Sequence, residues 1–246
     1  MKFVVDTHTH TVSSGHAYST LLENAQSAAE HGLTLMCVTD HAPSMPGSPH
    51  FWHFANQRIL PRFLHGVGIL RGVEVNIMNS DGEIDLQPHI SEQLDWVLAS
   101  LHEPVFRPSD RQTHTKALLN VIASGRVHAL GHLGNPNFDF DFETVITAAA
   151  EANVLIEINN SSLVGSRAGS KPRCEQIALV AKEVGAMLTT GSDAHFAHDV
   201  GKFDQVSELL SKIQFPEERV VTTNANRFVE FLKLRNNSNL DAFSAL

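Results

Sequence analysis

The sequence predicts an α/β fold in which about seven β/α units form a barrel within a single domain. Short apolar runs rich in β-branched residues alternate with amphipathic segments along the whole chain, a pattern typical of a parallel sheet with right-handed helical crossovers. No Pro-, Gly- or Ser-rich linker divides the 246 residues, and α/β barrels of this length are commonly single domains. Seven units in a chain of this length favour a barrel over an open sheet.

Strands are expected where an apolar run of four or more residues is followed by polar residues. In chain order the expected strands are Lys2–Val5, Leu33–Val38, Val67–Ile77, Trp96–Ser100, Val127–Leu130, Val154–Ile158 and Ala186–Thr190. The Asn79-Ser-Asp-Gly82 segment after the third of them is a turn signal.

Helices are expected where apolar residues recur at steps of three and four. They are Thr20–His31, Phe51–Leu64, Thr115–Ser124, Phe142–Ala152, Pro172–Val184, Asp204–Ile213 and Ala225–Leu234. Ser19 is expected to open the first helix and Gly32 to end it, while Pro61 is expected to kink or end the second. The domain is expected to cover residues 1–235, and the polar segment 236–246 to be a frayed C-terminal tail.

Composition excludes several classes of protein. Two cysteines cannot build a disulfide framework or a Cys-based zinc ribbon, and Cys37, inside a predicted strand, is expected in the core. A net charge of −9 without a Lys/Arg run argues against a nucleic-acid partner. The first residues, MKFVVDTHTH, lack the apolar region of a signal peptide, and no apolar run is long enough to span a membrane. We therefore expect a cytoplasmic protein with no membrane partner.

The 15 histidines are the unusual part of the composition, and many of them follow a predicted strand. In a β/α barrel the carboxyl ends of the strands converge on the face that carries the active site. Nine potential ligands lie within or soon after these strands: His8, His10, His16, His41, Glu74, His102, His132, Asp193 and His195. In His8-Thr-His10 the alternate side chains of an extended segment point to the same side, so both imidazoles can reach one ion.

This cluster predicts a metal site, because buried imidazoles and carboxylates are costly unless a cation organises them. Catalytic zinc usually takes three protein ligands and keeps one position open, so nine ligands suggest three ions, or two ions with some histidines outside the coordination sphere. Imidazole and carboxylate without thiolate suit Zn²⁺, and also Mn²⁺ or Fe²⁺. An ordinary structural role is expected for the other histidines: His31, His50, His53, His65, His89, His114, His128 and His198.

Together these motifs resemble a known family. They are Asp6-Thr-His8-Thr-His10, Thr39-Asp40-His41, Gly72-Val-Glu74, His102, His132 and Gly191-Ser-Asp193-Ala-His195. The set is similar to the PHP (polymerase and histidinol phosphatase) superfamily, and most similar to its stand-alone YcdX-type phosphatases.

The resemblance implies a distorted (β/α)7 TIM-like barrel with three Zn²⁺ ions, and it favours a homo-oligomer such as a trimer. By position, the first ion would be held by His8, His10, Glu74 and Asp193, the second by Glu74, His102 and His132, and the third by His16, His41 and His195. Glu74 would bridge the first two ions.

The chemistry expected of such a centre is hydrolysis of a phosphomonoester in a small phosphorylated substrate. Clustered divalent ions supply hydroxide near neutral pH and clamp a phosphate for in-line attack. Glu74, Asp193 and Asp40 are the expected catalytic carboxylates. Asp6 and Asp40 flank ligands, so each is expected either to orient an imidazole or to make a turn contact.

Two residues in the loop after the sixth strand, which is expected to supply no metal ligand, are candidates for substrate binding. Arg167 offers a guanidinium fork suited to phosphate, and Asn160 lies at the same end of the barrel.

Three other functions remain open. They are a phosphodiesterase or 3′–5′ exonuclease, a histidinol phosphatase, and a non-catalytic module that binds metal for structure. The acidic chain lacks the basic and aromatic stripes that bind single strands, which disfavours the exonuclease. A full ligand set without a fused polymerase disfavours the structural module.

Overall fold

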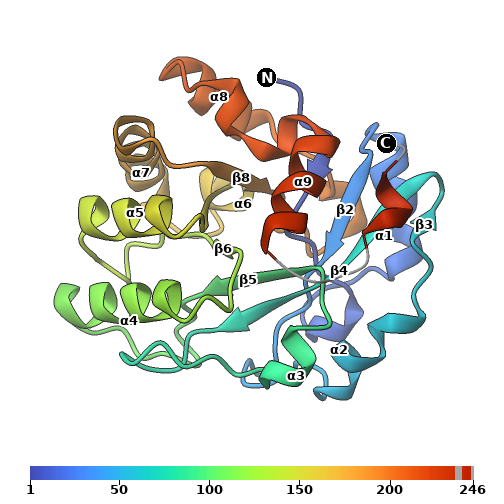
Figure 1. Ribbon diagram of the computed structural model, residues 1–246, viewed down its shortest axis with the longest axis horizontal. Helices are drawn as coiled ribbons and strands as arrows, with labels where there is room; N and C mark the ends of the chain where they lie inside the picture. Colours follow the sequence, from blue (N-terminus) through green and yellow to red (C-terminus); the bar gives the residue numbers. More distant parts are fainter. Residues whose placement is uncertain (236–239, 245–246) are drawn as a thin grey trace.

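Seven parallel strands form a nearly closed barrel with helices packed around it (Figure 1). The structure, a computed structural model, describes residues 1–235 and 240–244. Neighbouring strands follow the order β1-β2-β4-β5-β6-β7-β8, and β3 pairs antiparallel with β4 outside this series. The strands are β1 (Val5–Asp6), β2 (Leu35–Val38), β3 (Phe63–Leu64), β4 (Val67–Asn76), β5 (Trp96–Ser100), β6 (Ala129–Leu130), β7 (Leu155–Asn159) and β8 (Leu188–Gly191). The predicted single-domain (β/α)7 barrel is confirmed.

The helices lie between the strands in sequence and outside the barrel in space. Figure 1 shows α4, α5 and α7 next to one another along one flank. The helices are α1 (Leu21–Glu30), α2 (Trp52–Asn56), α3 (Pro88–Ser91), α4 (Arg111–Ala123), α5 (Phe142–Glu151), α6 (Asn160–Val164), α7 (Ser170–Val184), α8 (Asp204–Lys212) and α9 (Ala225–Arg235). None of the helices in the described part of the chain has the length and apolar character to cross a bilayer.

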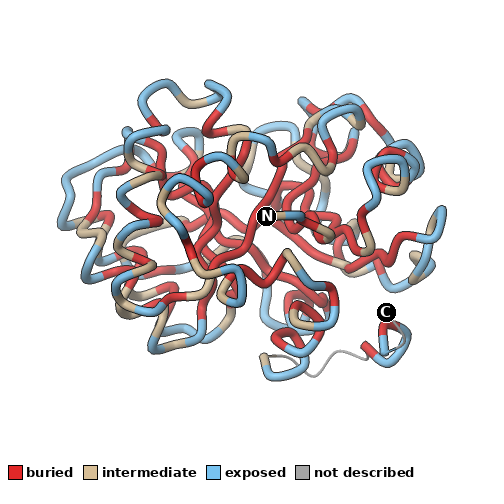
Figure 2. The backbone as a smooth tube through the Cα atoms, turned by 90° about the horizontal axis from the view of Figure 1, so that it is seen from above, coloured by how far each residue is buried: buried red, intermediate tan, exposed pale blue. Residues whose placement is uncertain are grey.

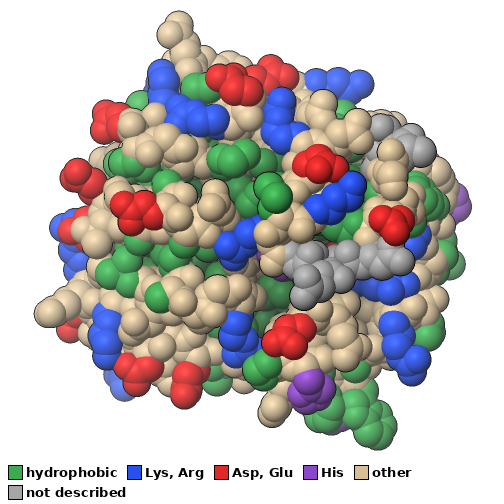
Figure 3. Space-filling view, viewed as in Figure 1, with side chains coloured by type: hydrophobic (Ala, Val, Ile, Leu, Met, Phe, Trp, Pro, Cys, Tyr) green, Lys and Arg blue, Asp and Glu red, His purple; other side chains and the backbone are tan. Residues whose placement is uncertain are grey.

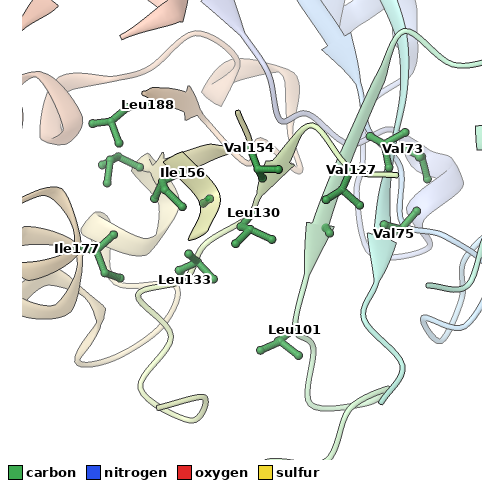
Figure 4. Close-up of a cluster of buried hydrophobic side chains, with 14 of the residues drawn as sticks. Val73, Val75, Leu101, Val127, Leu130, Leu133, Val154, Ile156, Ile177 and Leu188 are labelled. Atoms are coloured by element: carbon green, nitrogen blue, oxygen red, sulfur yellow. The ribbon is translucent and has the colours of Figure 1, made fainter. Parts of the chain in front are cut away.

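Alternate strand residues build two separate layers of core. One set faces outward and packs under the helices, as Val73, Val75 and Ile156 do in Figure 4. The other set fills the barrel near the strand starts and packs against α9. This inner set includes Val5, Leu35, Cys37, Leu70, Trp96, Leu98, Ala129, Leu155, Phe228 and Leu232. Cys37 therefore belongs to the core, as predicted, and Figure 2 shows the buried segments running through the centre of the molecule.

The barrel closes through the segments that follow β1 and β8. Thr9 forms a parallel bridge with Ala194, His10 donates its backbone N–H to the Ala194 carbonyl at 2.9 Å, and Asp193 donates to the His8 carbonyl at 2.9 Å. The first and last strands thus meet through the residues that carry the two His- and Asp-rich motifs.

The prediction of one helix over Phe51–Leu64 is wrong in its second half. The helical turns end at Ile59, Leu60 is extended with ψ 135°, and Phe63–Leu64 becomes strand β3. Pro61 explains the difference, because proline disfavours helical geometry in the residue before it and offers no N–H for a helix.

Helix starts also differ from the prediction. The first helix is capped by Thr20, whose side chain accepts the Glu23 N–H while the Glu23 carboxylate accepts from Thr20. Ser19 instead accepts the Ala197 N–H. The third predicted helix starts earlier, at Arg111, because Asp110 caps it. The short helices α3 and α6 were not predicted.

The expectation of a frayed tail is wrong for the described part of it. Leu240 and Phe243 are buried against the inner core, so residues 240–244 pack on the barrel. Residues 236–239 and 245–246 lie outside the described residues. The turn expected at Asn79–Gly82 is present, with Gly82 at φ 76°.

Candidate active site

The strands deliver polar side chains into the barrel above its apolar inner core. In β4, Glu74 lies four residues beyond the inward-facing Leu70, and in β7 Glu157 lies two residues beyond Leu155. Because alternate residues share a face of a strand, both carboxylates point inward near the carboxyl ends of the strands. Both are fully or almost fully buried.

The structure brings together all nine side chains predicted to bind metal. Ligand atoms lie within 4.8 Å of one another in three groups. These groups are His8 with His10 and Asp193, His41 with Glu74 and His102, and His10 with His41 and His195. The remaining two members lie beside them: His132 Nε2 is 3.2 Å from His102 Nε2, and His16 Nε2 is 3.0 Å from His195 Nε2.

Glu74 occupies the centre of the cluster. Its Oε1 lies 2.9 Å from His132 Nε2 and 3.3 Å from His102 Nε2. Its Oε2 lies 2.7 Å from His41 Nδ1 and 3.4 Å from His8 Nε2. One buried carboxylate therefore contacts imidazoles from four different segments, which is the position a bridging ligand needs.

The donor set fits divalent cations. His8 Nε2 and His10 Nε2 face each other at 3.0 Å. At least one of these two nitrogens therefore directs its lone pair at the other ring. Although His41 Nδ1 and Glu74 Oε2 are close, their alignment is poor, and neither atom has a hydrogen-bond partner among the described residues. Buried lone pairs that converge without partners are costly, and imidazole with carboxylate is a suitable ligand set for zinc.

The charges of the cluster keep its carboxylates ionised. Burial raises the pKa of Glu74, but the charges of His8, His102 and His41 outweigh it and hold the pKa well below its usual value. Burial likewise raises the pKa of Asp193, but His8 and His10 outweigh burial and hold this pKa well below its usual value.

The histidines of the cluster do not all titrate alike. Burial lowers the pKa of His132 to about 4, so this imidazole is neutral at physiological pH and has a lone pair to offer. For His8 the opposite holds: burial lowers its pKa, but Glu157, Glu74 and Asp193 outweigh this and raise it well above the usual value.

Two of the nine residues have backbone conformations that L-amino acids seldom adopt. His132 has φ 29° and Asp193 has φ 57°. Non-glycine residues in this region cost energy and concentrate at functional sites.

Asp40 acts on the cluster indirectly. Its carboxylate accepts hydrogen bonds from Thr11 N at 2.7 Å, Ser14 Oγ at 2.7 Å and His53 Nε2 at 3.2 Å. Ser14 Oγ in turn lies 3.0 Å from His10 Nδ1. These contacts place Asp40 behind His10 through Ser14, and its catalytic role stays a prediction. His53, expected to be merely structural, is a partner of this carboxylate.

Asp6 makes the turn contacts that were its alternative role. It accepts backbone N–H groups from His8, Ser192 and Gly201. These bonds hold together the two segments that close the barrel.

Glu157 is one of two residues around the cluster that the sequence did not predict. Its Oε1 lies 2.7 Å from His8 Nδ1, and its Oε2 accepts the His132 backbone N–H at 2.7 Å. Asn76 was also missed, and its Oδ1 lies 2.7 Å from His102 Nδ1. A single Glu at an inward position of an otherwise apolar strand was the available signal.

A pocket of about 770 Å³ opens above the cluster. It is lined by His16, His41, Met45, His102, Glu103, Asn135, Pro136, Asn137, Ser161, Ser166, Arg167, Ala168, Asp193, His195 and Asp199. Arg167 lies where predicted, with Nη1 3.1 Å from Asp193 Oδ2. Asn160 does not reach the pocket, because its Oδ1 accepts the Val206 N–H at 3.2 Å and ties α6 to α8. Its neighbour Ser161 lines the pocket instead, and a substrate contact of Asn160 stays a prediction.

Comparison with known proteins gives close relatives over the full length of the chain. A probable phosphatase of Photobacterium profundum is 64% identical over 235 residues, which are 96% of each chain. A probable phosphatase of Vibrio atlanticus is 61% identical over 245 residues, covering 99% of each chain.

A solved structure shares the fold at low sequence identity. Histidinol phosphate phosphatase from Lactococcus lactis, complexed with zinc, L-histidinol and phosphate, superposes with a TM-score of 0.64 and 18% identity over 88% of this chain and 95% of that one. The family model described as PHP domain matches residues 6–214, which include strands β2 to β8, the end of β1 and all nine clustered side chains. The chain therefore belongs to the PHP domain family.

Proposed function

We propose that this chain is a metal-dependent phosphatase that hydrolyses a phosphomonoester at a centre of three Zn²⁺ ions. Its class, a hydrolase of phosphoric ester bonds, follows from the family and from relatives named as phosphatases. The observation that carries the proposal is the convergence of nine imidazole and carboxylate side chains beneath an open pocket.

The proposed division of the ligands among the ions follows the order of the family motifs, although the distances also place His41 beside Glu74 and His102 and His10 beside His41 and His195. His8, His10, Glu74 and Asp193 would hold the first ion, Glu74, His102 and His132 the second, and His16, His41 and His195 the third. Bound divalent ions lower the pKa of water and stabilise negative charge on a phosphate.

The remaining residues of the site position this machinery. Glu157 fixes the ring of His8, Asn76 fixes that of His102, and Ser14 fixes that of His10. Each contact is made to Nδ1 and leaves Nε2 directed at the cluster, a common arrangement around ligating histidines. Arg167, anchored to Asp193 at the pocket wall, presents a cation to the phosphate oxygens.

A histidinol phosphatase and an exonuclease-like phosphodiesterase are the alternative enzymes, and a structural metal module is the alternative without catalysis. On the face shown in Figure 3, acidic and basic side chains are interspersed, which is a poor surface for a nucleic-acid backbone. A cytoplasmic location and a homotrimer also belong to the proposal, and light scattering on the purified protein tests the second.

The experiment measures metal content and activity on the same protein. The chain is stripped with a chelator, reloaded with Zn²⁺, and assayed for phosphate release from p-nitrophenyl phosphate and histidinol phosphate and for cleavage of a labelled oligonucleotide. We expect activity on monoesters that disappears on chelation and returns with zinc. Cleavage of the oligonucleotide alone would overturn the proposal, and inactivity on every substrate would favour the structural module.

Glu74→Gln is the matched variant, because it keeps the size of the central side chain and removes its charge. We expect it to lose zinc and to lower monoester hydrolysis by at least about 100-fold. Glu83→Gln, on an exposed turn outside the pocket, is the control and should keep both. Full zinc content together with full activity in Glu74→Gln would contradict the assignment.

A further inference from the structure

The amide of Asn159 lies between two buried carboxylates beside the histidine cluster. Asn159 is the last residue of β7 and is 1% exposed. Its Nδ2 donates to Glu157 Oε2 and to Asp193 Oδ2, both at 3.3 Å. An amide nitrogen carries two hydrogens, so this one side chain serves a carboxylate of its own strand and a carboxylate of the segment after β8.

The other end of the amide fixes its orientation. Asn159 Oδ1 accepts the Ser162 N–H at 2.9 Å and so caps the start of α6. A backbone N–H can only donate, and an ionised carboxylate, which the lowered pKa of Asp193 maintains, can only accept. The amide oxygen must therefore face α6, and the amide nitrogen must face the two carboxylates.

These contacts divide the two oxygens of Asp193 between different tasks. Its Oδ1 lies 3.3 Å from His10 Nε2 and 3.5 Å from His8 Nε2. Its Oδ2 accepts hydrogen bonds from Asn159 and from Arg167. The donors on Oδ2 thus keep Oδ1 turned toward imidazoles that are predicted to bind metal.

Glu157 is oriented by the same amide and transmits its position to another predicted ligand. Its Oε1 lies 2.7 Å from His8 Nδ1, while its Oε2 accepts from Asn159. Gly191, which pairs with Asn159 on the neighbouring strand, leaves room for this carboxylate, because a Cβ at the glycine would collide with Glu157 Oε1 and with His8 Cβ. One amide therefore acts on both sides of the seam between β1 and β8.

We propose that Asn159 is a positioning residue of the metal centre. Its two N–H groups hold the carboxylates of Asp193 and Glu157 in orientations that direct Asp193 Oδ1 and His8 Nε2 to the same ion. The inference rests on the metal centre of the proposed function and deepens it, because it gives a role there to the end of β7, a strand that supplies none of the nine clustered side chains.

The competing explanation is that Asn159 serves only as the cap of α6. Asn159→Ser separates the two roles, because a serine oxygen can still accept the Ser162 N–H, while the donors to the carboxylates are lost and no charge is added. Asn159→Asp is a second variant, which keeps the size of the side chain and its capping oxygen. Asn79→Ser is the matched control, since on its exposed turn Asn79 Oδ1 accepts the Asp81 N–H at 3.0 Å and Nδ2 donates to Glu83 Oε2 at 2.7 Å.

The first measurement is stepwise zinc binding to the metal-free protein in competition with a chelator of known affinity. In Asn159→Ser we expect one binding step to weaken by about 10- to 100-fold, the usual effect of losing a contact behind a ligand. Asn79→Ser should keep the natural affinities. Urea unfolding without metal shows that each variant is folded.

The second measurement is the visible absorption of the protein loaded with Co²⁺, which depends on the ligands and the geometry around the ion. We expect both substitutions at position 159 to change this spectrum, which the loss of a helix cap alone would leave as it is. If Asn159→Ser does not fold, the spectrum of Asn159→Asp decides. Natural zinc affinities together with a natural cobalt spectrum would overturn the inference, as would equal changes in Asn79→Ser.

The two measurements do not depend on catalysis, so this inference and the proposed function can fail separately. A natural protein that hydrolyses monoesters, with zinc binding and cobalt spectrum unaffected by the substitutions of Asn159, would reject only this inference. A weakened zinc-binding step in Asn159→Ser, together with no hydrolysis of any monoester by the zinc-loaded natural protein, would uphold the inference and reject the proposed function.

Discussion

Glu157 shows how one residue organises two others at the centre of the site. Its two oxygens contact the His8 ring and the His132 backbone, both at 2.7 Å. Glu157→Gln keeps the volume of the side chain but turns one charged acceptor into a neutral amide. We expect zinc affinity to fall by about 10- to 100-fold, the usual effect of losing such an outer contact.

The measurement is competition for zinc against a chelator of known affinity, followed by the metal content of the chain. Retained fold is checked by the far-ultraviolet circular dichroism of the zinc-free protein. An unchanged zinc affinity in Glu157→Gln would show that His8 and His132 hold their positions without it.

His128 gives a prediction about pH that is independent of the metal site. It is buried, its Nδ1 accepts the Val97 N–H at 2.8 Å, and burial lowers its pKa from 6.5 to about 3. Below pH 6.5 the unfolded chain gains a proton that the folded chain cannot accept. Stability is therefore fully present above pH 6.5 and is lost as the pH falls toward 3, by up to about 1.4 kcal/mol per pH unit.

His128→Asn removes the titration and keeps an acceptor for Val97. Between pH 6.5 and 5 we expect the zinc-free natural protein to lose about 2 kcal/mol more unfolding free energy than the variant. Urea unfolding at both pH values measures this difference, and equal losses in the two proteins would refute the prediction.

The sequence predicted the location of a side chain well where its position along a strand determines which way the side chain points. The histidines after β1, β2 and β5 converge because parallel strands end on one face. Asn160 stands at the first position of α6, and its side chain is turned toward α8. Nothing in the residue types of that loop distinguishes Asn160 from Ser161, which does reach the pocket.

Helix α1 offers the clearest test at the level of an element. Thr20 and Glu23 form a reciprocal capping box at its start, and Ala25 and Ala28 bury its inner face against the barrel. Thr20→Ala should lower the free energy of unfolding by about 1 kcal/mol, because the Glu23 N–H loses its acceptor.

Urea unfolding of Thr20→Ala, Glu23→Ala and the double variant measures the cap. Since the two side chains satisfy each other's backbone groups, the double variant should lose less than the sum of the single losses. Additive losses would mean that the two side chains do not act as a unit.

Element boundaries were harder to predict than element types. Strand β5 was predicted to the residue, because the apolar run begins directly after the charged Asp95 and ends at the polar Ser100. The segment Phe51–Leu64 failed because its apolar residues pack in two different ways, first as helix α2 and then as strand β3 against β4. The spacing of apolar residues indicates either a helix or a strand. When a segment of 14 residues changes from helix to strand, neither spacing is long enough to be recognised.

The whole barrel depends on the seam between its first and last strands, and the predicted metal ligands lie on both sides of it. His8 and His10 follow β1, while Asp193 follows β8, and His10 Nε2 lies 3.3 Å from Asp193 Oδ1 across the seam. Cations held there would tie the two ends of the sheet together and bind only the folded chain. Binding to the folded state alone stabilises it by about 4 kcal/mol when the ion is present at a thousand times its dissociation constant.

We therefore expect chelation to lower the free energy of unfolding by several kcal/mol, on the order of one such contribution for each ion lost, and added Zn²⁺ to restore it. Asp193→Asn should remove much of this gain, because the amide has no charge to offer an ion at the seam, while Glu83→Gln should retain it. Calorimetric melting of the three proteins with and without zinc makes the comparison. If the natural protein melts at the same temperature in both conditions, the cations do not join the strands, and the seam is held by the Thr9–Ala194 bridge and its neighbouring backbone hydrogen bonds alone.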